Sequence, residues 1–79
     1  NLYDLQLFPN PTNESFTVQC GKENTIESFS IFNFNGNLVW EEKNVNTQQK
    51  EVDIRLVKGT YIVVVTINGE VIHKKLMML

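Results

Sequence analysis

The 79-residue sequence contains no alanine, one cysteine and one histidine. Alanine has the highest helix propensity, so its absence from a chain rich in Val, Ile, Phe, Thr and Asn favours strands over helices. One cysteine cannot form an internal disulfide, and one cysteine with one histidine cannot supply the roughly four ligands of a zinc site. The sequence therefore predicts an all-β chain that holds no metal and no cofactor.

The sequence also lacks an excess of charge of one sign and a long apolar run. The formal net charge is −2, and acidic and basic residues are interspersed. A nucleic-acid-binding surface is normally basic, but the only clustered cations here are Lys74 and Lys75. The longest apolar run, residues 61–65, is far shorter than the roughly 20 residues that a membrane-spanning helix needs. We therefore expect neither nucleic-acid binding nor direct insertion into a membrane.

No group of residues is arranged for catalysis. A nucleophilic site would need Cys20 or a serine beside a base, and His73 lies in an alternating segment, as solvent-facing or half-buried histidines do. We expect Cys20 to be a small buried residue, because only Lys22 lies nearby to activate its thiol. Glu51 and Asp53 would share one face of a strand, where a solvated surface is more common than a calcium site. We predict that the chain is not an enzyme.

Alternation of apolar and polar residues predicts roughly six or seven short strands. Turn residues separate them about every eight to twelve residues, and no capping residue precedes a helical pattern. Residues 42–50 have no clear pattern, and we interpret them as a loop with at most a short edge strand. The fold class predicted is an immunoglobulin-like antiparallel β-sandwich of about seven short strands. The predicted strands are residues 5–7, 16–19, 28–32, 38–41, 52–56, 61–67 and 71–78.

Three features of the connections and one aromatic residue extend this prediction. Pro9 and Pro11 have no N–H to donate and must end the first strand, so we expect a stiff extended elbow that crosses between the sheets. Gly36 is placed to close a hairpin, and residues 68–69 (Asn-Gly) are the strongest short hairpin signal in the chain. Trp40 alternates with an apolar neighbour towards the core, so we predict that it is buried.

Five short motifs occur in order along the chain. Each is common alone, but five at these separations are specific. In this order the chain resembles the type A C-terminal sorting domain of the type IX secretion system (the Por secretion system), over about residues 2–79. The motifs are Leu7-Phe8-Pro9-Asn10-Pro11, residues 31–39 (IFNFNGNLV), Val52-Asp53-Ile54 with Leu56, residues 58–63 (KGTYIV), and His73-Lys74-Lys75-Leu76.

The resemblance implies an immunoglobulin-like sandwich of seven strands that forms a single sorting domain, residues 1–79, of a larger exported protein of Gram-negative bacteria. Such a domain directs its N-terminal cargo from the periplasm across the outer membrane to the cell surface or the medium. Its implied partners are the outer-membrane translocation machinery, a shuttle protein and a sortase-like cysteine protease. In many cases this protease cuts just before the domain and joins the cargo to anionic lipopolysaccharide. Any cleavage point would lie upstream of or near Asn1.

The resemblance also assigns roles to residues. The terminal lysine motif, which it implies is bound by the machinery, corresponds to Lys74 and Lys75. The chain departs from the family where Trp40 replaces the usual tyrosine and at its ending, residues 77–79, and both departures keep the apolar type. The remaining motif positions are structural: Pro9, Asn10 and Pro11 of the proline motif, Gly36 of the hairpin, and Gly59 and Tyr61 of the Gly-x-Tyr motif.

The last strand brings Lys74 and Lys75 next to Leu76 and Leu79, and we predict that they form a mixed cationic and apolar patch. Such a patch would dock by adding its strand to the edge of a partner's sheet, or by pairing its lysines with acidic groups. The alternative is that lysines on an edge strand only prevent aggregation. The residues alone favour docking and prevention of aggregation equally, and the resemblance favours docking.

A second class of function is an accessory binding module, fibronectin-like or carbohydrate-binding, attached to an exported enzyme. It would need an exposed aromatic platform, for which Trp40, Phe34 and Tyr3 are the candidates. A shielded Trp40 would argue against it.

Overall fold

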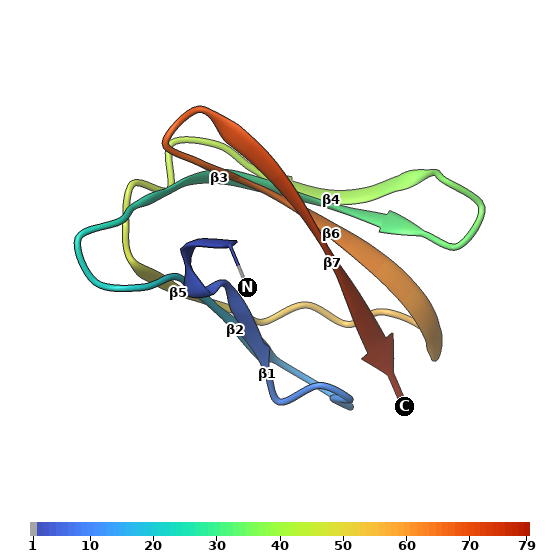
Figure 1. The fold of residues 1–79 in the computed structure, drawn as a ribbon. Coiled ribbons are helices and arrows are strands. Elements are labelled where there is room, and N and C mark those ends of the chain that lie inside the picture. The colour runs from blue at the N-terminus through green and yellow to red at the C-terminus, as the bar shows by residue number, and fades with distance from the viewer. Residues whose placement is uncertain (1) are drawn as a thin grey trace.

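The computed structural model describes residues 2–79, with side chains from Tyr3 onward. Seven strands form two antiparallel sheets that face each other (Figure 1), so the predicted immunoglobulin-like sandwich is confirmed. Apart from a single 3-10 turn, η1 (Leu2–Asp4), residues 2–79 contain no helix, and so none that could cross a membrane. The strands are β1 (Gln6–Phe8), β2 (Phe16–Gln19), β3 (Ile26–Asn33), β4 (Leu38–Glu42), β5 (Gln49–Val52), β6 (Gly59–Ile67) and β7 (Glu70–Met78).

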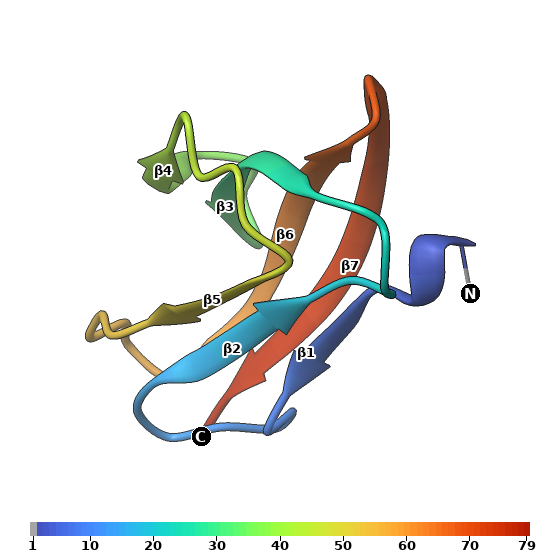
Figure 2. The ribbon, with the colours of Figure 1, turned by 90° about the vertical axis from the view of Figure 1, so that its left-hand side faces the viewer.

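The two sheets differ in width, and their edges lie in different places. One has four strands in the order β4-β3-β6-β7, and the other has three in the order β1-β2-β5. Figure 2 shows the wider sheet with β4 on one side and β7 on the other, and β1 close to β7. The C-terminal strand β7 is thus an edge strand, and it lies next to the first strand of the opposite sheet.

Alternation along the strands sends one face of each sheet into a shared core. In β6, Tyr61, Val63, Val65 and Ile67 are at most 4% exposed, and the residues between them are half-buried on the outer face. Fully burying one such side chain contributes about 1.5–3 kcal/mol. The core therefore stabilises a chain that has no disulfide. Its other apolar members are Leu5, Leu7, Phe16, Val18, Cys20, Ile26, Phe29, Ile31, Val52, Ile54, Leu76 and Met78.

One predicted strand is displaced. The alternating pattern placed it at residues 52–56, but the observed strand is β5, which begins in the segment interpreted as a loop. β5 pairs with β2, and the last pair joins Val52 to Phe16, the first residue of β2. Because no partner strand extends further, the ladder stops there. Ile54 still points into the core, at 8% exposure, without belonging to the sheet.

Two connections behave as predicted and one does not. Asn68 and Gly69 have φ values of 52° and 79° and close the hairpin between β6 and β7, a conformation that Asn and Gly tolerate best. Gly36 lies in the turn between β3 and β4, also at positive φ. The proline segment does cross towards the other sheet, since Thr12 forms a bridge with Met78. It is bent over residues 9–11 rather than extended, and both X–Pro peptide bonds are cis.

The prediction that Trp40 is buried is wrong. Its side chain is 38% exposed, although its register partner on β3 is Ile31, which is fully buried. β4 is the edge of the wider sheet, far from β7, and the narrower sheet does not cover it completely (Figure 2). Alternation placed Trp40 on the inward side correctly, but Leu38, expected on the same side, pairs with Phe32 on the outer face because the register shifts between Ile31 and Phe32. A side chain on the inward side of an edge strand is not necessarily enclosed.

Candidate docking surface around the C-terminal strand

The two lysines of the terminal motif lie on opposite faces of β7. Lys74 pairs in register with Val63, a core residue, so it faces the interior side of the sheet and is half-buried. Lys75 pairs with Ile62 on the outer face and is exposed. The predicted single patch is therefore divided, because neighbouring residues in a strand point in opposite directions.

The two leucines of the predicted patch are also separated. Leu76 pairs with Tyr61 and is 0% exposed, so it belongs to the core and is not available to a partner. Leu79 is 68% exposed and lies beyond the end of β7. It borders a depression of about 300 Å³ whose other walls come from residues 58–60 and from Met77 and Met78. Of the four residues, Lys75 and Leu79 are the ones that project into solvent.

The free edge of β7 is occupied along its C-terminal half by the proline elbow. The Asn10 side chain imitates a strand, since its Nδ2 donates to the Lys75 carbonyl at 2.8 Å and its Oδ1 accepts from the Met77 N–H at 3.1 Å. The Thr12 backbone continues this pairing: its N–H donates to Met77 O at 2.9 Å, and its carbonyl accepts from Leu79 N–H at 2.7 Å. Strand addition by a partner at residues 75–79 would require the elbow to leave.

The Gly-x-Tyr motif is structural. Gly59 has a φ of 152°, which residues with a Cβ rarely adopt, and it begins β6. Two residues later Tyr61 fills the core, and its hydroxyl donates to the Val57 carbonyl at 2.6 Å. A tyrosine near the start of such a strand, with its hydroxyl hydrogen-bonded to the backbone a few residues upstream, is the tyrosine corner found in many immunoglobulin-like domains. The motif therefore anchors the loop that leads into β6.

The residues considered for catalysis are not brought together. Cys20 is 0% exposed, its Sγ lies 3.5 Å from the Gln48 carbonyl, and burial raises the pKa of its thiol. His73 lies on the outer face of the opposite sheet, where it is exposed. Glu51 and Asp53 are exposed as well, and no cluster of three potential metal ligands occurs among the described residues. Among the described residues, the candidates from the sequence therefore do not form one site.

The three candidate aromatic residues do not form one platform. Phe34 is 84% exposed in the turn after β3, and Trp40 lies on the inward side of β4. Tyr3 lies at the start of the chain, where its hydroxyl donates to Glu70 Oε1 at 2.7 Å, and this hydrogen bond raises the pKa of Tyr3. Sequence reasoning missed a different apolar surface, the outer face of β3 and β6 around Phe32 and Ile62, because these two residues are neighbours only through strand pairing.

Comparison with known proteins identifies the family. The model of the secretion system C-terminal sorting domain matches residues 6–79, almost the whole chain. The chain belongs to this family. It is therefore a sorting signal for type IX secretion, from a family that is not catalytic, and it forms the tail of a protein exported across the outer membrane.

A solved structure supports the fold of this sorting domain. PorZ, an essential bacterial surface component of the type IX secretion system of Porphyromonas gingivalis, matches 99% of this chain with a TM-score of 0.74. The sequences are 18% identical over this region, so the likeness shows the fold alone, and the chain spans 12% of the length of PorZ. No curated protein matches the sorting domain.

Proposed function

We propose that residues 1–79 are the single sorting domain of a larger exported protein and act as a folded label for its cargo. The cargo passes through the periplasm, and the outer-membrane translocation machinery with its shuttle protein binds the label and moves the cargo to the cell surface or the medium. The observation that carries this proposal is the family match over residues 6–79. A compact sandwich with one core also suits a label that must fold independently of its passenger.

The proposal assigns partner contacts to the surface of the C-terminal strand. Lys75 is the principal contact, because it is exposed on the outer face, and Leu79 is a second contact at the chain end. Lys74 is a lesser contact, because it is half-buried on the inward side of β7. Leu76 acts indirectly, by holding β7 against the core. Docking through side chains is favoured over strand addition, because the elbow already occupies the C-terminal edge.

The proposal includes processing after export. A sortase-like protease removes the sorting domain and attaches the cargo to lipopolysaccharide at the surface. The cleavage point would precede the sandwich, near Asn1, which lies outside the described residues.

The direct experiment fuses residues 1–79 to a periplasmic reporter in a host that has the type IX machinery. The reporter should appear outside the cell, and the same reporter without the domain should stay in the periplasm. Retention of the fused reporter, with the domain folded, would refute the proposal. Replacing Lys74 and Lys75 together by Ala should block export and leave the fold intact, because neither ammonium group is part of the core.

An accessory binding module is the second candidate, and the observation that favours it is the exposure of Phe34. Such a module would bind a soluble oligosaccharide or protein without the export machinery. Titration of the isolated domain with oligosaccharides, followed through the Trp40 fluorescence, separates the two. We expect no saturable change, and a saturable change that Phe34→Ser abolishes would support the module instead.

A further inference from the structure

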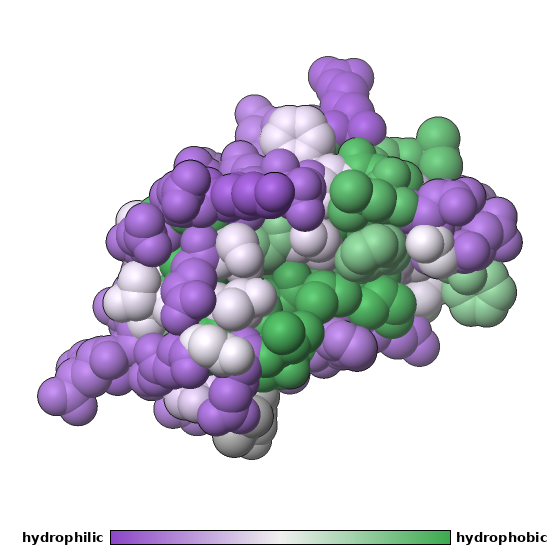
Figure 3. Space-filling view, turned by 90° about the horizontal axis from the view of Figure 1, so that it is seen from above, coloured by the Kyte–Doolittle hydropathy of each residue, from purple (hydrophilic) through white to green (hydrophobic). Residues whose placement is uncertain are grey.

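The outer face of the four-stranded sheet is apolar at one end and polar at the other. In register across the sheet, one row contains Leu38, Phe32, Ile62 and Lys75, from β4 to β7. The next row contains Glu41, Ser30, Val64 and His73, and the row after that contains Ser28, Thr66 and Val71. Figure 3 shows the result from above: an apolar band that crosses the sheet, with hydrophilic residues around it.

The apolar end is hollowed into a groove of about 680 Å³, a volume typical of binding sites. Its floor comes from β3 and β6, the turn after β3 forms one end, and β7 forms one side. The only ionisable side chains that line it, His73 and Lys75, belong to β7, and no acidic residue lines it. The lining residues are Phe32, Asn33, Phe34, Gly36, Thr60, Ile62, Val64, His73 and Lys75.

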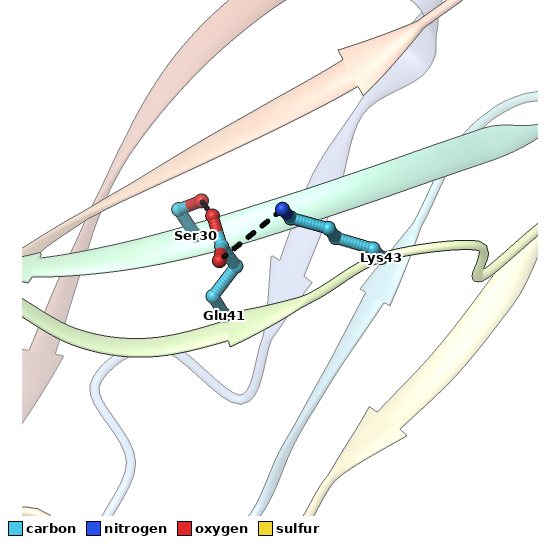
Figure 4. Close-up of polar contacts among 3 residues, drawn as sticks. All are labelled: Ser30, Glu41 and Lys43. Carbon is cyan, nitrogen blue, oxygen red and sulfur yellow. Dashed lines mark hydrogen bonds and ion pairs between the residues drawn. The ribbon is translucent and has the colours of Figure 1, made fainter.

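The nearest acidic residue of the same face is held away from the groove. Glu41 accepts a hydrogen bond from Ser30 Oγ at 3.4 Å, and its other carboxylate oxygen lies 4.0 Å from Lys43 Nζ (Figure 4). Ser30 belongs to β3, two strands from β7, and Lys43 follows β4, which is three strands from β7. Among residues 2–79 the one salt bridge joins Lys43 to Glu41, so within this described part of the chain Lys75 has no acidic partner.

We propose that this groove binds a segment of a partner protein that presents an apolar side chain with a carboxylate beside it. The apolar side chain packs on Phe32 and Ile62, and the carboxylate pairs with Lys75. Buried apolar anchors in pockets carry most of the energy of protein interfaces, and charge complementarity selects the partner and its orientation. The proposal rests on the proposed function only in taking this partner to be part of the export machinery.

Charge argues against the other occupants of such a face. Attraction to an anionic membrane surface commonly uses clusters of four to eight basic residues, whereas the groove has one lysine and the chain has a net charge of −2. In a symmetric dimer through this face, each copy would present the same residues, and the one acidic residue in these rows, Glu41, already pairs with Ser30 and Lys43 of its own copy. A partner segment that carries an apolar side chain and an acidic residue complements both the apolar floor of the groove and Lys75 at its side.

The test is an NMR titration of the isotopically labelled chain with a capped peptide, Ser-Gly-Glu-Phe-Glu-Gly-Ser, at up to millimolar concentration. We expect saturable shifts at Phe32, Ile62, Val64 and Lys75, and binding about tenfold weaker when both Glu residues of the peptide are Lys. Equal binding of the two peptides, no shifts, or shifts confined to another face would overturn the proposal. So would shifts of these residues with anionic lipid vesicles and not with the peptide.

Two matched pairs of variants sharpen the test. Phe34→Ser and Val57→Ser each remove a side chain that is more than 80% exposed, and only the first lines the groove. Lys75→Glu and Lys22→Glu each reverse an exposed charge, and only the first lies at the groove. The first member of each pair should weaken acidic-peptide binding about tenfold, and the second should leave it unchanged. Equal effects within the pairs would contradict the assignment.

The same variants separate failure of this inference from failure of the proposed function. If the unaltered domain exports a reporter and Phe34→Ser and Lys75→Glu export it equally well, the groove is not the docking surface although the domain is a sorting signal. If the peptide titration behaves as expected and the unaltered domain fails to export, the groove binds an acidic partner and the proposed function is wrong.

Discussion

At the scale of single residues, position relative to the sheet decides what each motif residue does. Lys74 and Lys75 are neighbours in sequence, but one lies over the core side of β7 and the other on its outer face. Asn10 and Tyr61, which the resemblance assigns to motifs, both act through hydrogen bonds to backbone groups. The two Asn10 bonds are made to β7 itself, the strand that carries Lys75.

Asn10→Ala tests the elbow at this scale. The substitution removes two hydrogen bonds to the edge of β7, and each contributes about 0.5–1.5 kcal/mol, so we expect the free energy of unfolding to fall by about 1–3 kcal/mol. Urea denaturation measures the loss. Asn35→Ala is the control, because the Asn35 side chain is exposed and makes none of these bonds. Similar losses of unfolding free energy for the two substitutions would show that the Asn10 hydrogen bonds do not stabilise the edge of β7.

Cys20 gives a prediction on pH. Burial raises the pKa of its thiol in the folded state above the value of 9.0 that an unburied thiol has, so the unfolded chain ionises first as the pH rises. The stabilisation is complete below about pH 9 and is lost as the pH rises through the folded pKa. The free energy of unfolding should therefore fall more steeply above pH 9 for the native chain than for Cys20→Val. Parallel pH profiles for the two proteins would show that Cys20 is not buried.

At the scale of elements, β7 combines a core face, an outer face and a covered edge. Leu76→Ala removes a fully buried side chain and should destabilise the domain by about 2–5 kcal/mol. Leu79→Ala changes an exposed side chain and should change stability by less than about 0.5 kcal/mol. Denaturant unfolding compares the two. A small effect of Leu76→Ala would mean that this leucine lies on the surface, as the sequence alone suggested.

Alternation of residues predicts the strands well where a strand has a partner along its whole length. It places β6 and β7 closely, but it left Leu76 of β7 in an exposed patch although this residue is buried. It fails for β5, whose extent is set by the start of β2 at Phe16, and for Trp40, whose exposure depends on the width of the opposite sheet. The extent of β5 and the exposure of Trp40 each depend on a neighbouring element, and the local sequence pattern carries no information about that element.

The candidate site was predicted in part for the same reason. The motif identified β7, but the proposed patch joined residues by their spacing in sequence, whereas the sheet joins them by register. Lys75 meets Ile62 and Phe32 across three strands, and no local pattern links these residues. The asparagine that covers the strand edge lies 65 residues from Lys75, so it too is visible only in the fold.

At the scale of the whole molecule, the sandwich is a support that presents one charged and apolar surface next to the end of the chain. The small core, the tyrosine corner and the elbow fix β7 in place, and the outer face remains open for a partner. A label of this design depends on its fold for position and on few side chains for recognition. Substitutions that leave the sandwich intact but alter the outer face should therefore abolish sorting.

The most direct measurement is the ratio of extracellular to periplasmic reporter for fusions that carry the native domain, Lys22→Glu or Lys75→Glu. We predict that the native and Lys22→Glu fusions are exported equally, and that the Lys75→Glu fusion stays in the periplasm with its domain folded. Export of the Lys75→Glu fusion at the native level would contradict recognition through the outer face of the last strand.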